Sequence, residues 1–365
     1  MYIYEYDNWT DFSYNPQKIM PLLEECHFLQ GRLISKMEML GLSQREEKIL
    51  SSIENDIIKS SEIEGFILNK SQVRSSIANR LGIKISDSVI IDRNVDAVVE
   101  MMLDATQNYE KPLTKERLFS WHACLFPTGY SGMNRIEVAK YRSGGMQVVS
   151  GALGMEKVHY EAPKAEEVPH LMDVFLEWLN SANEEDSLLK AAVAHFWFVT
   201  IHPFEDGNGR IARAISDMLL CRSDCTNFRF YSMSNQISIE KKSYYDVLER
   251  AQHGTPEITE WIHWFLSCLK RAIDDSYKET DVVLKKYSLL QNIRGVSLNA
   301  RQSLMIEKLT SGSWFGVLNS SKWAKIAKCS SDTALRDITD LIEKGILEKV
   351  PTSGGRSTNY TLRDA

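Results

Sequence analysis

Apolar residues recur at helical spacing along much of this chain of 365 residues. The clearest helical patterns cover residues 22–40, 168–179, 188–201 and 258–273. Strand-like alternation is confined to a few short runs, and the sequence shows no internal repeat or low-complexity tract. The pattern therefore predicts a mainly α protein, with Trp197, Trp261 and Trp264 in its core.

The pattern changes after a charged helical stretch at residues 281–292. Beyond it the sequence predicts three helices and two strands, at residues 300–310, 321–327, 332–344, 346–350 and 359–362. The strands flank a turn at residues 353–356, and this order of elements is that of a winged helix. We therefore expect three parts, which are a helical N-terminal region at residues 1–82, a central domain at 83–292 and a winged-helix domain at 293–365.

Residues 202–213 read His-Pro-Phe-Glu-Asp-Gly-Asn-Gly-Arg-Ile-Ala-Arg and hold the densest chemistry of the chain. His202 can act as a general base near neutral pH. Pro203 favours an extended or turn backbone at His202, so the preceding helix is expected to end there. Asp206 offers the hard oxygen ligand that suits Mg²⁺, and the apolar Phe204 is expected to fix the loop to the core.

The second half of this stretch is suited to an anion. Gly207 and Gly209 leave room for a ligand to reach backbone N–H groups, and a predicted helix at residues 210–220 points its N-terminus at the same place. Arg210 and Arg213 share one face of that helix, and each can bind phosphate oxygens. These residues indicate a site for a metal-bound polyphosphate beside a base. The structural alternative is a Gly-Asn-Gly turn between two helices.

The stretch resembles the signature of the Fic family, His-Pro-Phe-x-Asp/Glu-Gly-Asn-Gly-Arg-x-x-Arg, at every defined position. Most Fic proteins transfer AMP from ATP to a hydroxyl of a target protein and release pyrophosphate. The resemblance implies that His202 is the base and that Asp206 holds Mg²⁺. It implies a nucleotide site made of Gly207, Asn208, Gly209, Arg210, Ile211, Ala212 and Arg213, with Arg213 on the γ-phosphate. Relatives that transfer phosphate carry lysine in place of Gly209, so the glycine favours AMP transfer, although other nucleotide donors remain an alternative.

Residues 60–65, Ser-Ser-Glu-Ile-Glu-Gly, follow a helical run at residues 44–59. They resemble the Fic inhibitory motif, Ser/Thr-x-x-x-Glu-Gly/Asn, which implies inhibitory roles for Ser60 and Glu64 and a pair between Glu64 and Arg213. A guanidinium held by a carboxylate cannot also serve a phosphate. The alternative is an ordinary helix end at Gly65. Whether Glu64 also supports removal of AMP stays open, as does the signal that relieves inhibition.

Two β-prone runs at residues 146–150 and 156–160 flank a glycine-containing turn at 151–154 and predict a hairpin. The hairpin resembles the Fic flap, which pairs with the backbone of the target protein. The resemblance implies a hydroxyl-bearing protein partner docked along residues 146–160, with His159 facing solvent or target. A hairpin that only packs is the alternative. Self-modification and homodimer formation are also left open.

Residues 242–252 are predicted to begin a helix that carries Tyr244, Tyr245 and Gln252. Tyr245 and Gln252 are seven residues apart and are expected to share a face. In similar Fic proteins this region contacts the nucleoside, so the resemblance implies that all three residues bind the nucleotide through stacking and amide hydrogen bonds. Packing of the tyrosines in the core is the alternative.

The composition is that of an ordinary globular protein, with 43% hydrophobic and 25% charged residues. The net charge of −6 gives no overall case for nucleic acid. The first residues lack the pattern of a signal peptide, no apolar run approaches a membrane span, and six scattered cysteines show no metal or disulfide spacing. We therefore expect a cytoplasmic protein with reduced cysteines and no membrane partner.

The C-terminal part is mildly basic. Residues 297–365 hold ten Lys and Arg against seven Asp and Glu, whereas the remainder holds 33 against 42. The third predicted helix carries four acidic residues, Asp332, Asp337, Asp340 and Glu343, which would repel DNA unless they face inward or away. Arg336 and Arg356 would be the main DNA contacts, and a role in protein docking or dimerisation is at least an equal alternative.

The sequence thus predicts a Fic-type helical core with a β-hairpin flap and a C-terminal winged helix. Its predicted function is that of an autoinhibited protein adenylyltransferase that uses ATP and Mg²⁺. The alternatives are a DNA-binding regulator with a nucleotide-sensing Fic domain, and a Fic enzyme that uses another nucleotide or removes AMP.

Overall fold

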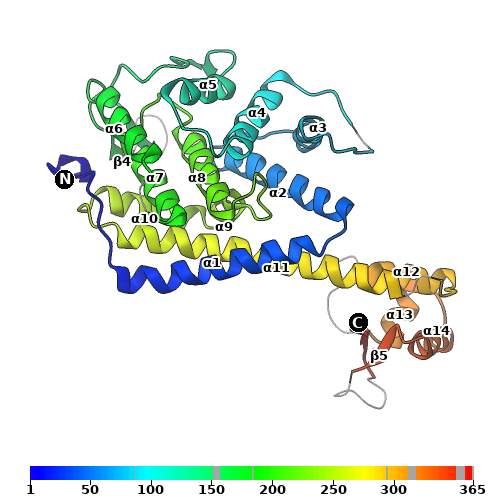
Figure 1. The fold of residues 1–365 in the computed structure, drawn as a ribbon. Coiled ribbons are helices and arrows are strands. Elements are labelled where there is room, and N and C mark those ends of the chain that lie inside the picture. The colour runs from blue at the N-terminus through cyan, green and yellow to red at the C-terminus, as the bar shows by residue number, and fades with distance from the viewer. Residues whose placement is uncertain are drawn as a thin grey trace. The chain divides into compact units, whose positions relative to one another are not determined.

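The computed structural model describes residues 1–86, 88–150, 157–182, 185–292, 295–310, 318–350 and 358–363. Its helices are η1 (Ile3–Glu5), α1 (Pro16–Glu38), α2 (Leu42–Ile63), α3 (Lys70–Leu81), α4 (Arg93–Gln107), α5 (Lys115–Leu125), α6 (Val168–Asn180), α7 (Ser187–Ile201), α8 (Asn208–Asp224), α9 (Met233–Ile239), α10 (Lys241–Gln252), α11 (Thr259–Asn292), α12 (Ala300–Thr310), α13 (Ser320–Ala327) and α14 (Ser331–Glu343). Its strands are β1 (Tyr130–Ser131), β2 (Asn134–Arg135), β3 (Gln147–Ser150), β4 (Lys157–Glu161), β5 (Leu347–Lys349) and β6 (Tyr360–Leu362). They form three antiparallel pairs, β1 with β2, β3 with β4 and β5 with β6. The predicted mainly α fold is confirmed (Figure 1).

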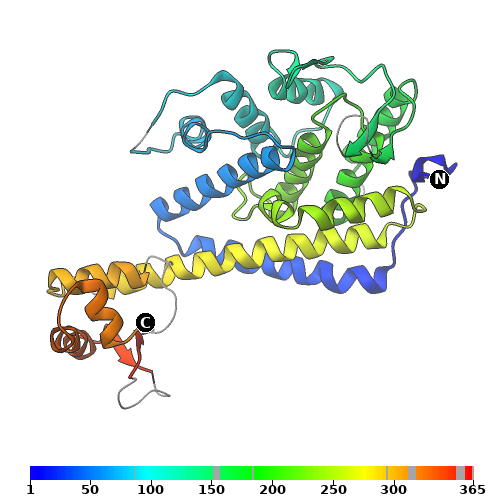
Figure 2. The same ribbon diagram turned by 180° about the vertical axis from the view of Figure 1, so that it is seen from behind.

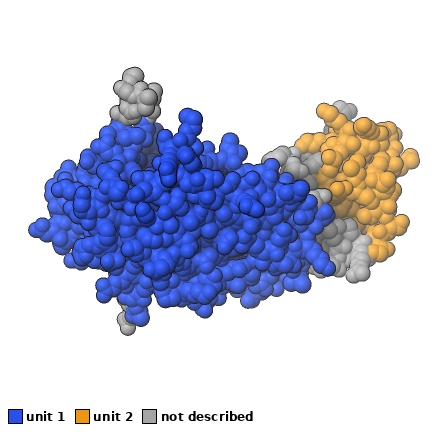
Figure 3. All heavy atoms as spheres, turned by 90° about the horizontal axis from the view of Figure 1, so that it is seen from above, with its two compact units in different colours: residues 1–276 blue, residues 277–365 orange. Residues whose placement is uncertain are grey.

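The described chain divides into two compact units, residues 1–276 and residues 277–365, which Figure 3 shows in separate colours. The division falls inside α11, whereas the sequence analysis placed the last boundary at residue 292, where α11 ends. Each unit has its own core, so the two are described separately.

The sequence pattern placed helix ends wrongly in two places. It predicted separate helices at residues 258–273 and 281–292, but α11 is continuous. Residues 274–280 contain neither glycine nor proline, so nothing ends the helix where its apolar stripe weakens. Similarly, α2 continues four residues beyond the predicted end at residue 59, which places Ser60 inside the helix.

Helices α7 and α8 form the centre of the first unit. Every residue of α7 from Leu188 to Ile201 is buried, as is most of α8, and the two helices pack along each other. A helix that is apolar on all sides is stable only where other elements cover all of its sides. Here α6 packs on α7, while α2, α4 and α5 pack on α8. The signature stretch is the connection between these two central helices.

Helix α1 lies along the first part of α11, as both ribbon views show (Figure 1, Figure 2). The Cys26 thiol donates to the Leu266 carbonyl at 3.4 Å, and Lys270 pairs with Glu25 at 2.6 Å. Trp197, Trp261 and Trp264 are buried as predicted, with 9% exposure or less.

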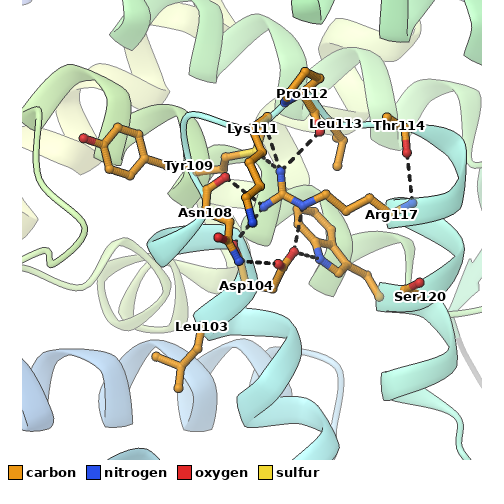
Figure 4. Close-up of polar contacts among 12 residues, drawn as sticks. Leu103, Asp104, Asn108, Tyr109, Lys111, Pro112, Leu113, Thr114, Arg117 and Ser120 are labelled. Carbon is orange, nitrogen blue, oxygen red and sulfur yellow. Dashed lines mark hydrogen bonds and ion pairs between the residues drawn. The ribbon is translucent and has the colours of Figure 1, made fainter. Parts of the chain in front are cut away.

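A polar cluster fixes the turn between α4 and α5 (Figure 4). The Asp104 carboxylate accepts hydrogen bonds from Arg117 Nε and Trp121 Nε1, both at 2.7 Å. Arg117 also donates to the carbonyls of Asp104, Asn108 and Lys111. Because these donors satisfy the turn's carbonyls, α5 is held in one position against α4, and α5 carries residues that lie beneath the signature loop.

The second unit contains α12, α13, α14 and the β5–β6 hairpin around the fully buried Trp323. Helix α12 has the bounds that the sequence predicted, and α13 and α14 each begin one residue earlier than predicted. An isolated bridge joins Leu318 to Tyr360 beside the hairpin. The predicted turn at residues 353–356, with Arg356, lies outside the described residues, as does the flap turn at 151–154.

All six cysteines are free thiols. Among the helices that the structure describes, none has the length and apolar character needed to span a bilayer.

Candidate functional site

His202 is the residue at which α7 ends. Its N–H donates to the Phe198 carbonyl at 3.0 Å, and its backbone is left-handed, with φ 52° and ψ 59°. The helix ends where the sequence predicted, but an extended or turn backbone was expected at this residue. A left-handed residue that closes the last helical turn is a common helix end, and at this position it outweighs the preference set by Pro203.

The His202 ring is held in one tautomer. Its Nδ1 lies 3.1 Å from the Val199 carbonyl, which can only accept, so Nδ1 carries the proton and Nε2 keeps its lone pair. Arg142 donates from Nε to the His202 carbonyl at 2.8 Å and fixes the backbone. Burial lowers the pKa of His202, although the Val199 carbonyl and the charges of Glu64 and Asp206 oppose the shift. The ring is therefore neutral at pH 7 and able to accept a proton at Nε2.

The loop after His202 is closed by Asn208. The Asn208 Oδ1 accepts the Phe204 N–H at 3.0 Å, and its Nδ2 donates to the Phe204 carbonyl at 2.7 Å. The Phe204 ring is fully buried, as predicted. The sequence analysis placed Asn208 on the phosphates, but its side chain is engaged by the loop's own backbone because both groups lie within the same tight turn.

The N-terminus of α8 presents free backbone donors. The first helical bond of α8 runs from the Ile211 N–H to the Gly207 carbonyl at 3.0 Å, so the N–H groups of residues 208–210 are available to a ligand. Ile211 and Ala212, which the sequence analysis included in the nucleotide site, are fully buried in the core behind this end. Gly207 adopts φ 85°, and a Cβ there would lie 2.9 Å from the Phe126 ring, so the position requires glycine.

Arg213 and Glu64 meet as the sequence predicted. Arg213 is 1% exposed and donates from Nη2 to Glu64 Oε1 at 2.7 Å. It also donates to the Ser60 hydroxyl at 2.8 Å and to the Ser60 carbonyl at 2.9 Å. A Cβ on Gly209 would lie 2.1 Å from Glu64 Oε1, so the carboxylate packs directly on this glycine. Glu64 thus occupies the space in front of the α8 N-terminus, where an anion would bind.

Arg210 is buried without a full set of partners. Its side chain is 5% exposed, its Nη2 lies 3.8 Å from Asp206 Oδ1, and Nε and Nη2 have no hydrogen-bond partner among the described residues. The guanidinium carbon lies 4.4 Å from the centre of the Phe66 ring and 4.9 Å from that of Phe126. These unused donors are of the kind that binds phosphate oxygens.

Asp206 fits a single-carboxylate magnesium site. Its side chain is 34% exposed, Oδ1 accepts the Gly207 N–H at 2.5 Å, and Oδ2 accepts the Ser131 hydroxyl. In the part of the chain that the structure describes, no group of three or more His, Cys, Asp or Glu side chains could hold a metal ion. Mg²⁺ commonly takes one or two carboxylates and completes its shell with phosphate and water, so these residues fit an ion that arrives with a nucleotide.

The three residues predicted to contact the nucleoside do not share one environment. Tyr244 is 2% exposed, and its hydroxyl lies 3.0 Å from His195 Nε2 in the core. Gln252 is 4% exposed and donates weakly to the Val199 carbonyl at 3.4 Å. Tyr245 is 37% exposed. Packing therefore accounts for Tyr244 and Gln252, and Tyr245 is the member of the set whose ring is open to a ligand.

The predicted hairpin is formed by β3 and β4, with Val149 paired opposite Val158. His159, which was expected to face solvent or target, keeps 27% of its side chain exposed and is also paired. Its Nδ1 lies 2.8 Å from Glu249 Oε2 on α10, and its Nε2 lies 2.6 Å from the Ser150 hydroxyl. Val149 and Val158 are nearly half exposed, so the outer face of the hairpin is open for contact.

Sequence reasoning missed the residues that support the signature loop from outside. His122 lies 3.1 Å from the Asp206 carbonyl through Nε2 and accepts the Ala139 N–H at Nδ1, also at 3.1 Å. Burial lowers the pKa of His122 to about 4, so the ring stays neutral, and it stacks on Phe204 with centroids 4.2 Å apart. Nothing in the sequence around His122 signals this role, because its partners lie 17 and 84 residues away.

Comparison with known proteins gives two family matches. The description "Fic/DOC family" matches residues 112–220, and "Domain of unknown function (DUF4172)" matches residues 2–83. Among curated relatives, the protein adenylyltransferase Fic of Nematostella vectensis is 32% identical over 33% of this chain and 27% of its own length. That of Aedes aegypti is 27% identical over 58% of this chain and 39% of its own length. A probable protein adenylyltransferase of Aquifex aeolicus is 27% identical over 46% of each chain.

The chain thus spans from about a quarter to about half the length of these relatives. Among solved structures, a Fic family protein from Desulfovibrio desulfuricans matches with a TM-score of 0.58 and 21% identity, over 96% of this chain and 97% of that one. A Fic domain-containing signaling protein from Bacteroides thetaiotaomicron matches with a TM-score of 0.51 and 22% identity, over 69% of this chain and 97% of that one. At these identities the structural matches establish similarity of fold.

Proposed function

Because residues 112–220 form a domain of the Fic/DOC family, we propose that this chain is a protein adenylyltransferase that is held in an inhibited state. It transfers AMP from ATP to a hydroxyl of a target protein, or of itself, and releases pyrophosphate. The observation that carries the proposal is the contact of Glu64 with Arg213 directly in front of Gly209, beside a histidine whose Nε2 is free to accept a proton.

Each residue of the site has a separate role in this reaction. His202 Nε2 takes the proton of the acceptor hydroxyl, the hydroxyl oxygen bonds to the α-phosphorus, and the bond to pyrophosphate breaks. The N–H groups of residues 208–210 and the unused donors of Arg210 bind the phosphate oxygens. Asp206 would hold Mg²⁺, which neutralises charge on the phosphates when bound.

Glu64 inhibits this reaction in two ways. Its carboxylate uses the Arg213 donor that would otherwise bind the γ-phosphate, and its negative charge repels that phosphate from the α8 N-terminus. Ser60 holds Arg213 through two further hydrogen bonds, so the arginine is fixed even where Glu64 is absent. Exchange of Glu64 alone is therefore expected to free the γ-phosphate position without moving Arg213.

Self-labelling with α-³²P-ATP and Mg²⁺ tests the proposal in wild type, Glu64→Gly and Glu64→Gly/His202→Ala. We expect weak label in wild type, strong label in the single variant and none in the double variant. Glu62→Gln is the matched control, because Glu62 lies on the same turn and pairs with Lys59 at 2.7 Å, away from Arg213. An unlabelled Glu64→Gly variant that still binds ATP would contradict AMP transfer.

DNA binding by the second unit is the second candidate function, and one observation favours it. Two of the four acidic residues of α14 face inward or are paired. Asp337 is 5% exposed and binds Arg301 at 2.7 Å, and Asp340 accepts from Gln302 at 2.7 Å. Arg336 is exposed on the same helix. Retention on DNA that weakens steeply with salt would support this function, and retention by a protein partner alone would favour docking.

A further inference from the structure

Arg210 is a buried cation whose donors are not used. Its Nε and Nη2 have no hydrogen-bond partner in the described residues, and the nearest carboxylate oxygen is 3.8 Å away. A buried guanidinium with unused donors is costly unless an anion completes it. Something other than hydrogen bonds must therefore hold the group in place before a ligand arrives.

Two aromatic rings provide that support. Phe126 follows α5, is 3% exposed and also packs beneath Gly207, so it is part of the fixed core of the site. Phe66 lies nearer, with its ring centre 4.4 Å from the guanidinium carbon. A cation is attracted to the face of an aromatic ring, and this contact consumes none of the N–H donors that a phosphate would need.

Phe66 belongs to the segment that also carries Glu64. The Phe66 N–H donates to the Ser61 carbonyl at 3.0 Å, and Gly65 between the two side chains adopts φ 82°. Lys241 donates to the Ile63 carbonyl at 2.5 Å and fixes the same turn to α10. A rigid turn thus places a carboxylate against Arg213 and an aromatic ring against Arg210.

The two contacts have opposite consequences for a phosphate ligand. Glu64 occupies a donor of Arg213 and brings a negative charge to the phosphate site. Phe66 leaves the donors of Arg210 unoccupied and brings no charge. Loss of the Phe66 ring would leave Arg210 supported on one ring and free to change rotamer.

We propose that Phe66 is a positioning residue of the phosphate-binding site, which it serves by holding the Arg210 guanidinium ready for a nucleoside triphosphate. The inhibitory segment is therefore also a part of the substrate site, and removing the whole segment lowers nucleotide affinity whereas removing the Glu64 carboxylate alone raises it. The inference rests on the proposed function only for the identity of the anion as a nucleotide.

Calorimetric titration of the full chain with ATP and Mg²⁺ tests this inference in the Glu64→Gly background, so that the Glu64 carboxylate does not obscure the result. Adding Phe66→Ala or Phe66→Leu is expected to raise the Kd by about 5- to 30-fold. Phe66→Tyr is expected to keep the Kd of the background, because it retains the ring. Ile67→Ala is the matched control, since Ile67 is the next residue and is 91% exposed.

AMP transfer by the same variants separates positioning from general damage. We expect KM for ATP to rise with Kd in the Ala and Leu variants while kcat changes little, and Phe66→Leu to keep the Tm of the background because apolar bulk remains. An unchanged Kd in Phe66→Leu, or an equal loss in Ile67→Ala, overturns the inference. If Glu64→Gly transfers no AMP but the Kd values follow the expected order, the proposed function fails and the inference stands.

Discussion

Arg210 and Arg213 lie one helical turn apart on α8, yet their surroundings differ. Arg213 donates to Ser60 and Glu64 through Nε and Nη2 and keeps Nη1 unpaired among the described residues, while Arg210 has aromatic neighbours and leaves Nε and Nη2 unpaired. The sequence signature predicts that both arginines bind phosphate, and their spacing alone does not show that their environments differ. The difference comes from a segment about 150 residues earlier in the chain, which brings one acid and one ring to the same helix end.

The pH dependence of AMP transfer reports the state of His202. Burial lowers the pKa of His202 below its ordinary 6.5, and the Glu64 charge, which raises that pKa, is absent in Glu64→Gly. The base is active when neutral, so the transfer rate of Glu64→Gly is expected to fall as the pH decreases, with its half-maximal point below about pH 6.5. Initial rates across pH measure this, and a rate already halved at neutral pH would be inconsistent with a lowered pKa.

Substitution Gly209→Ala is expected to force Glu64 away from Arg213. The new Cβ would lie 2.1 Å from Glu64 Oε1, and that carboxylate ends a flexible side chain. We expect the free energy of unfolding to drop by about 1–3 kcal/mol in wild type and by much less in Glu64→Gly, where only the milder contact of the Cβ with Arg213 Nη1 at 3.2 Å remains. Urea denaturation of wild type, Gly209→Ala, Glu64→Gly and the double variant measures the free energy of unfolding. Gly31→Ala is the control, because a Cβ there meets nothing within 4 Å, and an equal loss in both backgrounds would place the strain elsewhere.

At the scale of elements, α2 carries the inhibitory residues and is fixed by a buried charge cluster. Asp56 and Ser60 on α2 and Glu64 at its C-cap recur every four residues, so they lie along one side of this segment. Arg229 binds Asp56 on α2 and Asp217 on α8, both at 2.7 Å, and all three side chains are buried. Burial raises the pKa of Asp217, and the positive charge of Arg229 counteracts this. The cluster therefore sets the position of α2 against the helix that carries Arg213.

Removal of Arg229 should destabilise the fold strongly. Arg229→Met would leave two buried carboxylates without a cation, which we expect to cost about 3–5 kcal/mol in urea unfolding. The control is Arg250→Met, which loses an exposed pair with Glu260 and should cost at most about 1 kcal/mol. The double substitution Arg229→Met/Asp217→Asn should recover part of the lost free energy of unfolding. Similar losses at Arg229 and Arg250 would show that the cluster contributes little.

The sequence predicted the elements whose boundaries are chemically marked. Helix α12 and the end of α7 at His202 are where the pattern placed them, because caps and proline act locally. The pairing of Glu64 with Arg213 followed from a resemblance. The orientation of Asn208, the depth of Tyr244 and the support from His122 could not be predicted, because each depends on which distant element covers the residue. The continuity of α11 was missed because a fading apolar stripe resembles a helix end.

At the scale of the whole molecule, the two units have separate cores and different charge. The second core gathers Met305, Ile306, Leu318, Trp323, Ile338 and Leu341. Residues 277–365 hold 14 Lys and Arg against nine Asp and Glu, whereas residues 1–276 hold 29 against 40. Each unit thus has the apolar interior that a folded unit needs, which allows the second unit to be perturbed by a single core substitution.

Trp323→Ala should therefore loosen the second unit selectively. Loss of a fully buried tryptophan is expected to cost about 3–5 kcal/mol, and the deficit should appear as faster amide exchange in α12, α13 and α14. Trp323→Phe should show a smaller effect, because most of the apolar volume remains. In the Glu64→Gly background, AMP transfer is expected to be unchanged, because every residue assigned to the reaction lies in the first unit. Hydrogen exchange followed by mass spectrometry measures the loosening of the second unit, and self-labelling with α-³²P-ATP measures AMP transfer. Transfer that rises or falls with Trp323→Ala would instead show that the second unit influences the site.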